Sequence, residues 1–193
     1  MKTKIILILA MFTVCFSCKK DVETTDPNEI LEIFEGLPTN NVIGIKTIGN
    51  GKSGTFKSFG SGLISKSTKK GFFFLNVASY NVNEELRDYL TMDDLPLTKG
   101  RFPIVTSKLV ENDNIIDALY ARMAADGDIS GAQYSLDTSK ANEIEITDVD
   151  TVANYARGKL NVHFVMKGES IIPNLPQKVS FTSVNFYVLL TWK

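Results

Sequence analysis

The clearest pattern in the chain is an alternation of apolar and polar residues over positions 159–167. The apolar positions on one side are Leu160, Val162, Phe164 and Met166. This period of two predicts an antiparallel strand with one face on a core and the other in water. His163, the only histidine, falls on the polar side, so we expect an outward-facing side chain.

Two further segments alternate in the same way. Near the C-terminus the apolar phase changes by one residue at Thr182–Ser183, which predicts a β-bulge. Glu143 to Thr147 is a second clean alternation, and continuing it would turn Asp148 and Asp150 inward. We therefore expect this strand to end near Thr147 and the acidic residues to lie in a turn.

Residues 72–77 are apolar at almost every position, which favours a strand buried on both faces. An alternative is that Phe72, Phe74 and Tyr80 form an exposed aromatic surface that stacks on a ligand such as a sugar ring. These three residues are the candidate ligand-binding residues of the sequence.

Residues 114–125 are ambiguous between helix and strand. Ile116, Leu119, Tyr120 and Met123 follow helical spacing. The Asp126-Gly127 pair that follows is a hairpin signal, and the strand-rich surroundings favour continuing the sheet. We lean to a strand and keep the helix as the alternative.

Together these segments predict an all-β domain of eight or nine antiparallel strands. The expected architecture is a β-sandwich, with a small lipocalin-like barrel as the alternative, in which Gly60 and Gly62 would mark a bending strand. A short helix is expected to precede the strands, capped by Asp26 and ended by Gly36.

The composition limits the partners and the kinds of catalysis that are expected of this protein. The 193 residues suit one domain, and 21 Lys+Arg against 22 Asp+Glu give a net charge of −1, which argues against nucleic acid as a partner. The only cysteines are Cys15 and Cys18 and the only histidine is His163, so we expect no metal site and no catalytic triad in the domain. No phosphate-binding loop is present in the sequence, and we expect no cofactor. We expect a non-enzyme; the alternative hydrolase would draw carboxylates from Asp88, Asp93, Asp94 or Glu111.

The N-terminus has the features of a secretory signal. Lys2 and Lys4 precede an uncharged stretch, Ile5 to Phe16, which is too short to span a bilayer. The Ser17-Cys18 step that follows resembles the lipobox of bacterial lipoproteins, in the relaxed form found in Bacteroidota. Cys15 and the bulky Phe16 depart from the usual lipobox. The alternative is an ordinary secreted protein cut near Ser17.

The resemblance implies a signal peptide over 1–17, a lipidated tether over 18–26 and one β-rich domain over 27–193. In that family the cysteine becomes the acylated N-terminus, so Cys18 is the expected lipidation site and the lipid bilayer an expected partner. The protein would be anchored in the outer membrane, facing either the periplasm or the cell surface. The strands resemble small, uncharacterised all-β domains of lipoproteins from the same phylum.

Three functions are consistent with that setting. The first is a non-catalytic binding or structural module of the cell envelope, with an envelope protein or a glycan as partner. The second is a lipocalin-like carrier of an apolar small molecule, and the third a glycan-binding or glycan-acting surface lipoprotein. Asp150-Thr151-Val152 also resembles the O-glycosylation signal of Bacteroidota, which makes Thr151 a candidate glycosylation site.

Overall fold

The computed structural model describes residues 41–49, 51–64, 71–81, 83–106, 116–124, 127 and 129–192. The expected signal peptide, Cys18, the tether and the helix from Asp26 to Gly36 lie outside these residues. The described part is built of strands and contains no helix, so it also contains none long and apolar enough to cross a membrane. The strands are β1 (Val42–Ile48), β2 (Ser53–Ile64), β3 (Phe72–Tyr80), β4 (Leu86–Pro96), β5 (Gly100–Pro103), β6 (Ala118–Met123), β7 (Ser130–Leu136), β8 (Glu143–Asp150), β9 (Tyr155–Met166) and β10 (Lys178–Trp192).

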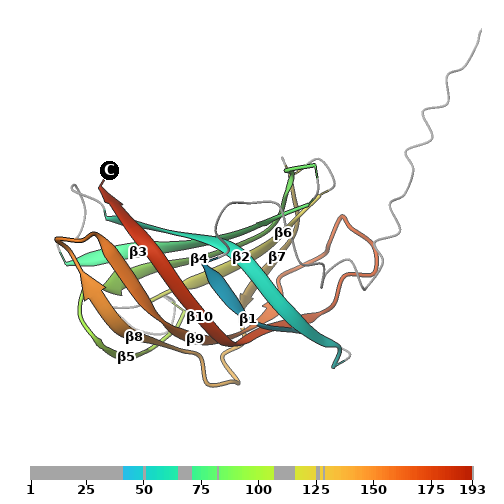
Figure 1. Ribbon diagram of the computed structural model, residues 1–193. Helices are drawn as coiled ribbons and strands as arrows, with labels where there is room; N and C mark the ends of the chain where they lie inside the picture. The colour runs from blue at the N-terminus through green and yellow to red at the C-terminus, as the bar shows by residue number, and fades with distance from the viewer. Residues whose placement is uncertain are drawn as a thin grey trace, which may run out of the picture.

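Eight of these strands close into an antiparallel barrel (Figure 1). The ring runs β1-β2-β3-β4-β6-β7-β9-β10, and it closes because β10 pairs with β9 along one edge and with β1 along the other. β1 is short, so the last residues of β10 pass its end and pair directly with β2, in parallel. The expected β-sandwich is therefore wrong. The structure is a closed barrel, which is compatible with the alternative that the sequence left open.

A sandwich and a barrel require the same alternation of apolar and polar residues along each strand. This alternation therefore could not distinguish the two architectures. The deciding feature is the length of β9 and β10, which have 12 and 15 residues. Strands this long pair with different partners along their two halves. β9 pairs with β8 over its first half and with β7 near its end, so one continuous sheet wraps round and leaves no second layer.

β5 and β8 form a two-stranded extension of the barrel wall beside β9. β5 is an edge strand, a position that suits Pro103 because proline has no N–H to donate to a further strand. Beyond β5, a parallel bridge joins Ile104 to Ile116, just ahead of β6. The extension thus fills the wall between β6 and β9 at the end of the barrel that β7 does not reach.

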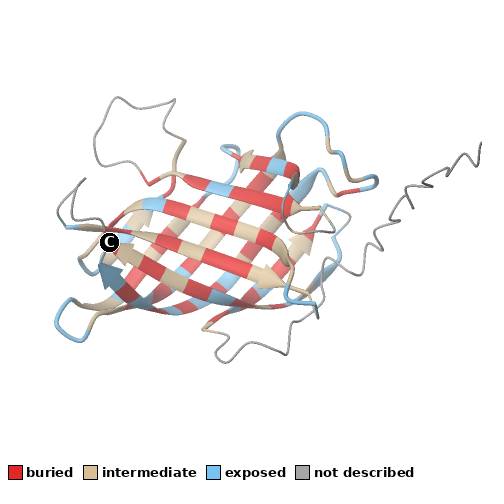
Figure 2. Ribbon diagram, turned by 90° about the horizontal axis from the view of Figure 1, so that it is seen from above, coloured by how far each residue is buried: buried red, intermediate tan, exposed pale blue. Residues whose placement is uncertain are grey.

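Inward and outward positions alternate on every strand of the barrel (Figure 2). The interior is packed with side chains, of which the largest fully buried ones are Tyr120, Tyr134, Lys46, Phe73, Phe164, Phe181, Leu75, Met92, Leu95, Ile144, Ile146 and Leu160. Gly60 and Gly62 of β2 face inward, where an added Cβ would lie 2.5 Å from Val42 and 2.6 Å from Leu190. The two glycines allow β2 to approach these neighbours closely.

Bulges decide which residues face the core. The one expected near Thr182–Ser183 is confirmed: the pairing of β10 with β9 shifts between Phe181 and Val184, and Ser183 adopts a positive φ of 51°. A second bulge, between Ile146 and Asp148, was not expected. It turns Asp148 outward, so β8 continues to Asp150 and the expected end near Thr147 is wrong.

The ambiguous segment 114–125 forms a strand where the structure describes it, as β6. Tyr120 and Arg122 face the core and Leu119 is exposed, so the spacing that suggested a helix arose from residues on both faces of a strand. At the end of the barrel near Arg122, residues 167–177 between β9 and β10 hydrogen-bond to β7, with Leu175 in the core. Tyr134 holds this loop by donating a hydrogen bond of 2.9 Å to the carbonyl of Pro176.

Candidate binding groove on the outer face of the barrel

A charged cluster occupies the interior of the barrel, near the end at which residues 167–177 lie. The Lys46 ammonium and the Asp88 carboxylate are 2.9 Å apart, and the Arg122 guanidinium approaches the same carboxylate oxygen at 3.3 Å. Tyr120 donates a hydrogen bond of 2.6 Å to the other oxygen. The Lys46 nitrogen also lies 5.4 Å and 5.5 Å from the ring centroids of Tyr120 and Phe181, within reach of a cation–π interaction.

The cluster has strong effects on ionisation. Burial alone would raise the pKa of Asp88, but the charges of Lys46 and Arg122 and the hydrogen bond from Tyr120 outweigh it and lower this pKa to about 2. Burial lowers the pKa of Lys46, against the opposing effect of Asp88. Burial and the adjacent Asp88 raise the pKa of Tyr120 well above its usual value. The carboxylate is therefore ionised throughout the physiological pH range.

The positions of these three charged residues along their strands already indicate that they are buried, although the predictions from sequence did not include the cluster. Lys46, Asp88 and Arg122 each occupy a position in phase with the apolar, inward residues of their own strand. A charged residue in such a phase is buried only if it is paired. In this barrel the cluster acts as part of the packing: all three side chains are at least nine-tenths buried among aromatic rings.

Three adjoining hollows lie along the wall of the described part of the barrel. The first, of about 570 Å³, lies between β5 and the β7–β8 turn. The central hollow, of about 370 Å³, lies over β8, β9 and β10, and shares Arg101 and Glu143 with the first. The third, of about 360 Å³, extends to β1 and shares Lys159 and Asn185 with the central one. We call these three together the outer groove.

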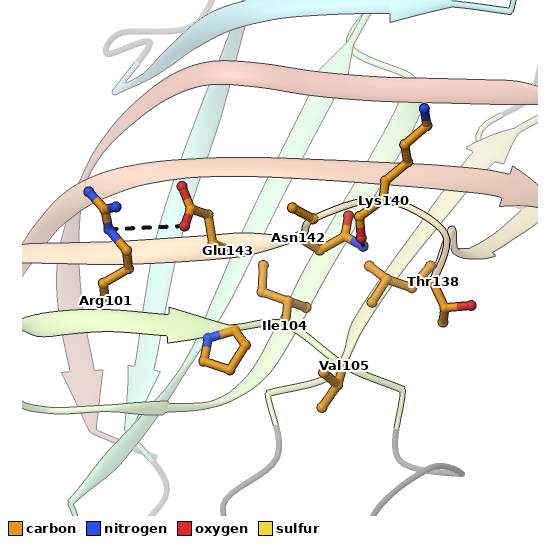
Figure 3. Close-up of a pocket in the computed structure, with 10 residues that line it drawn as sticks. Arg101, Ile104, Val105, Thr138, Lys140, Asn142 and Glu143 are labelled. Carbon is orange, nitrogen blue, oxygen red and sulfur yellow. Dashed lines mark hydrogen bonds and ion pairs between the residues drawn. The ribbon is translucent and has the colours of Figure 1, made fainter.

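Figure 3 shows the first hollow. Arg101 points toward Glu143 along the edge that the first two hollows share, at 4.0 Å, while Ile104 and Val105 provide an apolar floor. Lys140, Thr138 and Asn142 line the opposite side. Asn142 is held in place because its amide nitrogen donates to the carbonyls of Asp137 and Lys140 and its oxygen accepts from the His163 N–H.

The pairing of the strands sets the side chains of the central hollow in rows. One row crosses the sheet from Arg101 on β5 through Glu145 on β8 and Lys159 on β9 to Asn185 on β10. The neighbouring row holds Glu143, Asn161 and Ser183. Arg101 lies 3.5 Å from Glu145, whereas within the described part of the chain Lys159 has no carboxylate within 4.0 Å.

Two stacked tyrosines border the third hollow. The rings of Tyr155 and Tyr187 are 5.5 Å apart with an interplanar angle of 22°. The Tyr155 hydroxyl donates a hydrogen bond of 2.9 Å to Asp148, which also pairs with Lys99 and Arg157, each at 2.9 Å. Hydrogen bonds from Lys99 and Tyr155, together with the neighbouring cations, lower the pKa of Asp148 to about 2. Tyr155 is thereby fixed, while 46% of Tyr187 remains exposed.

The aromatic residues singled out by the sequence lie elsewhere. Phe72, Phe74 and Tyr80 all belong to the outer side of β3 and are half-buried, and Phe73 between the first two is fully buried. Tyr80 is six residues beyond Phe74, roughly 20 Å at about 3.3 Å per residue. The three rings are therefore not brought together into one stacking surface, although each stays partly accessible.

Two other predicted positions are found at the surface. His163 faces outward, as expected, and its Nδ1 is 2.8 Å from the Ser180 hydroxyl. Burial, followed by the nearby Lys140, lowers its pKa. Thr151 is exposed in the turn between β8 and β9, where Asp150 accepts hydrogen bonds from the N–H groups of Val152 and Ala153. Thr151 is thus accessible to a modifying enzyme.

None of the described carboxylates considered for hydrolysis lines one of the three hollows. Asp88 is enclosed in the barrel, and Glu111 lies outside the described residues. Burial and the neighbouring Asp117 and Asp94 raise the pKa of Asp93, but neither Asp93 nor Asp117 lines any of the three hollows. Among the residues that the structure describes, no group of three or more histidine, cysteine, aspartate or glutamate side chains could hold a metal ion.

Comparisons with protein-family models, with curated proteins and with solved structures found no match to this chain. The geometry of the barrel and of the outer groove is therefore the basis for inferring a function.

Proposed function

We propose that this protein is a lipid-anchored, non-catalytic binding module of the cell envelope that holds its partner on the outside of the barrel. The observation that carries the proposal is the contrast between a filled interior and a hollowed outer wall. The interior is occupied by aromatic and aliphatic side chains and by the Lys46–Asp88–Arg122 cluster. The outer groove combines polar side chains with exposed Tyr187.

The anchoring part of the proposal is supported by the N-terminal sequence. The Lys2–Phe16 segment and Ser17-Cys18 resemble a lipoprotein signal, and acyl chains on Cys18 would hold the domain at the outer membrane. Residues 19–26 would serve as the tether. Without residues 1–17 the charge is 19 basic minus 22 acidic residues, or −3, so attraction to an anionic membrane does not contribute.

The anchor is tested by metabolic labelling with a palmitate analogue. We expect the full chain to be labelled, the Cys18→Ala variant to be unlabelled, and the matched Cys15→Ala variant to keep its label. Protease treatment of intact cells then distinguishes a surface location from a periplasmic one. An unlabelled wild-type chain would contradict the anchor and leave an ordinary secreted protein.

The binding role is tested by photo-crosslinking in intact envelopes. A photoreactive amino acid replaces Asn185 in the groove in one variant of the full chain. In the control variant it replaces Leu119, which is 44% exposed on β6. We expect adducts from position 185 and none from position 119. Equal yields from both positions, or none from position 185, would contradict a binding role for the groove.

A further inference from the structure

We propose that the central and third hollows of the outer groove bind a neutral oligosaccharide, with Tyr187 stacking on one sugar ring. This inference rests on the proposed binding role and adds the class of ligand. It depends on three features of these two hollows, which are a pre-positioned aromatic ring, side chains with unused hydrogen-bonding capacity, and charges that are largely paired with one another.

The first feature is the position of Tyr187. Tyr155 and Leu189 lie in the row on one side of it, while Lys159 and Asn185 lie in the row on the other. Because Tyr155 covers one face of the Tyr187 ring, the opposite face borders the hollow. The stack, and the hydrogen bond from Tyr155 to Asp148, hold the ring in place before a ligand arrives. A fixed ring loses little conformational entropy on binding and suits the apolar C–H face of a pyranose.

The second feature is the set of amide and ammonium groups beside that ring. The Asn161 side-chain oxygen accepts a hydrogen bond of 2.8 Å from the Ser183 N–H, which fixes the amide and leaves its NH₂ toward the hollow. The Asn185 NH₂ makes one long contact of 3.3 Å, and its oxygen has no hydrogen-bond donor within the described part of the chain. Such amides both donate and accept, as sugar hydroxyls do.

The third feature is the charge of the surface. Arg101 pairs with Glu143 and Glu145, and Arg157 pairs with Asp148, which lies beside the lining and also pairs with Lys99. Among the cations that line the two hollows, Lys159 alone has no carboxylate within 4.0 Å in the described part of the chain. The central and third hollows therefore offer a polyanion a single unpaired cation, and a polycation no unpaired carboxylate. Lys159, Glu143 and Glu145 at the centre also argue against a protein partner, because lysine and glutamate are depleted at the cores of protein interfaces. A neutral, polyhydroxylated ligand fits both constraints.

The size of the site agrees with more than one sugar unit. The two hollows are about 370 Å³ and 360 Å³ and share Lys159 and Asn185. Each lies in the range of about 300–1,000 Å³ that is common for small-molecule sites. Both are open to solvent on the face of a sheet, which is the arrangement that an extended chain passing across the strands requires.

The test is binding of the full chain to an array of neutral and anionic oligosaccharides and polysaccharides, with affinities then measured by titration. We expect at least one neutral glycan to bind and the anionic ones not to bind. Tyr187→Ala should weaken binding about tenfold, and Tyr187→Trp, which keeps an aromatic surface, should retain it. Leu119→Ala, which removes an exposed side chain of β6 outside the groove, should bind as the wild type does.

Two results would overturn the inference. One is that no neutral glycan binds. The other is that Tyr187→Ala loses no more affinity than Leu119→Ala. The crosslinking experiment separates this failure from that of the proposed function. Adducts from position 185 that glycoside hydrolases leave intact, and in which mass spectrometry identifies peptides of a second protein, would keep the binding role and replace the glycan by a protein.

Discussion

Lys46 on β1 and Asp88 on β4 are 42 positions apart in the sequence, yet their charged atoms lie 2.9 Å apart inside the barrel. Arg122 on β6 reaches the same carboxylate. The single anion therefore holds two cations, and both the folding and the acid stability of the protein are expected to depend on it.

Replacing Asp88 by asparagine should strongly destabilise the fold. The variant keeps the shape of the side chain but leaves Lys46 and Arg122 buried with no countercharge from this position. Removing one partner of a buried ion pair typically costs about 3–5 kcal/mol. Urea denaturation followed by circular dichroism measures the free energy of unfolding. The control is Glu145→Gln, an outer-face ion-pair partner, for which we expect a change of about 0–1 kcal/mol. Equal effects of the two substitutions would contradict a special role for Asp88.

Acid should unfold the protein partly through Asp88. Its pKa is about 2 in the folded protein and near 3.8 when unperturbed, so the folded state favours the ionised form. The resulting stability is complete above the unperturbed pKa and is lost as the pH falls from about 4 to about 2. Asp88→Asn should have a flatter stability profile in this window. Asp148→Asn is the comparison, since it retains the Asp88 contribution, and parallel profiles for wild type and Asp88→Asn would refute the expectation.

Gly158→Ala should disrupt the pairing of β8 with β9. An added Cβ would collide with the carbonyl oxygen of Glu145 and lie 2.8 Å from the Phe186 ring. Because the carbonyl belongs to a paired strand, it cannot move without breaking the register, and we expect a cost of at least about 1–3 kcal/mol. Gly49→Ala is the control, since its Cβ would come no closer than 3.5 Å to the backbone of Lys178. Thermal unfolding should separate the two variants clearly.

The filled interior leads to an expectation about apolar ligands. Tyr120, Tyr134, Phe164 and Phe181 occupy the space that a lipocalin-like carrier would leave for its cargo. We expect no saturable binding when a fluorescent fatty acid is titrated into the protein, under conditions in which a known carrier binds it stoichiometrically. One-to-one binding would mean that the barrel opens, and would favour the carrier over the proposed binding module.

The pattern of apolar and polar residues predicted the structure correctly where the alternation of side chains along a single strand determines it. The alternation around Leu160 and Val162 placed β9, and the change of phase near Ser183 placed its bulge, because side chains on a strand point to opposite faces in turn. The bulge at Asp148 left no comparable trace. A surface carboxylate that meets Lys99 and Arg157 only after folding looks the same in sequence as one in a turn.

The sequence alone determined that the protein is a strand-rich domain whose apolar side chains face inward and whose charged side chains mostly face outward. Both features follow from the two-residue period of side chains along a single strand. Only the tertiary structure decided that the sheet closes, because closure depends on which strands β9 and β10 pair with at long range. The same is true of the buried Lys46–Asp88 pair and of the groove beside Tyr187. Each is formed by residues from different strands, and no local pattern records the distance between them.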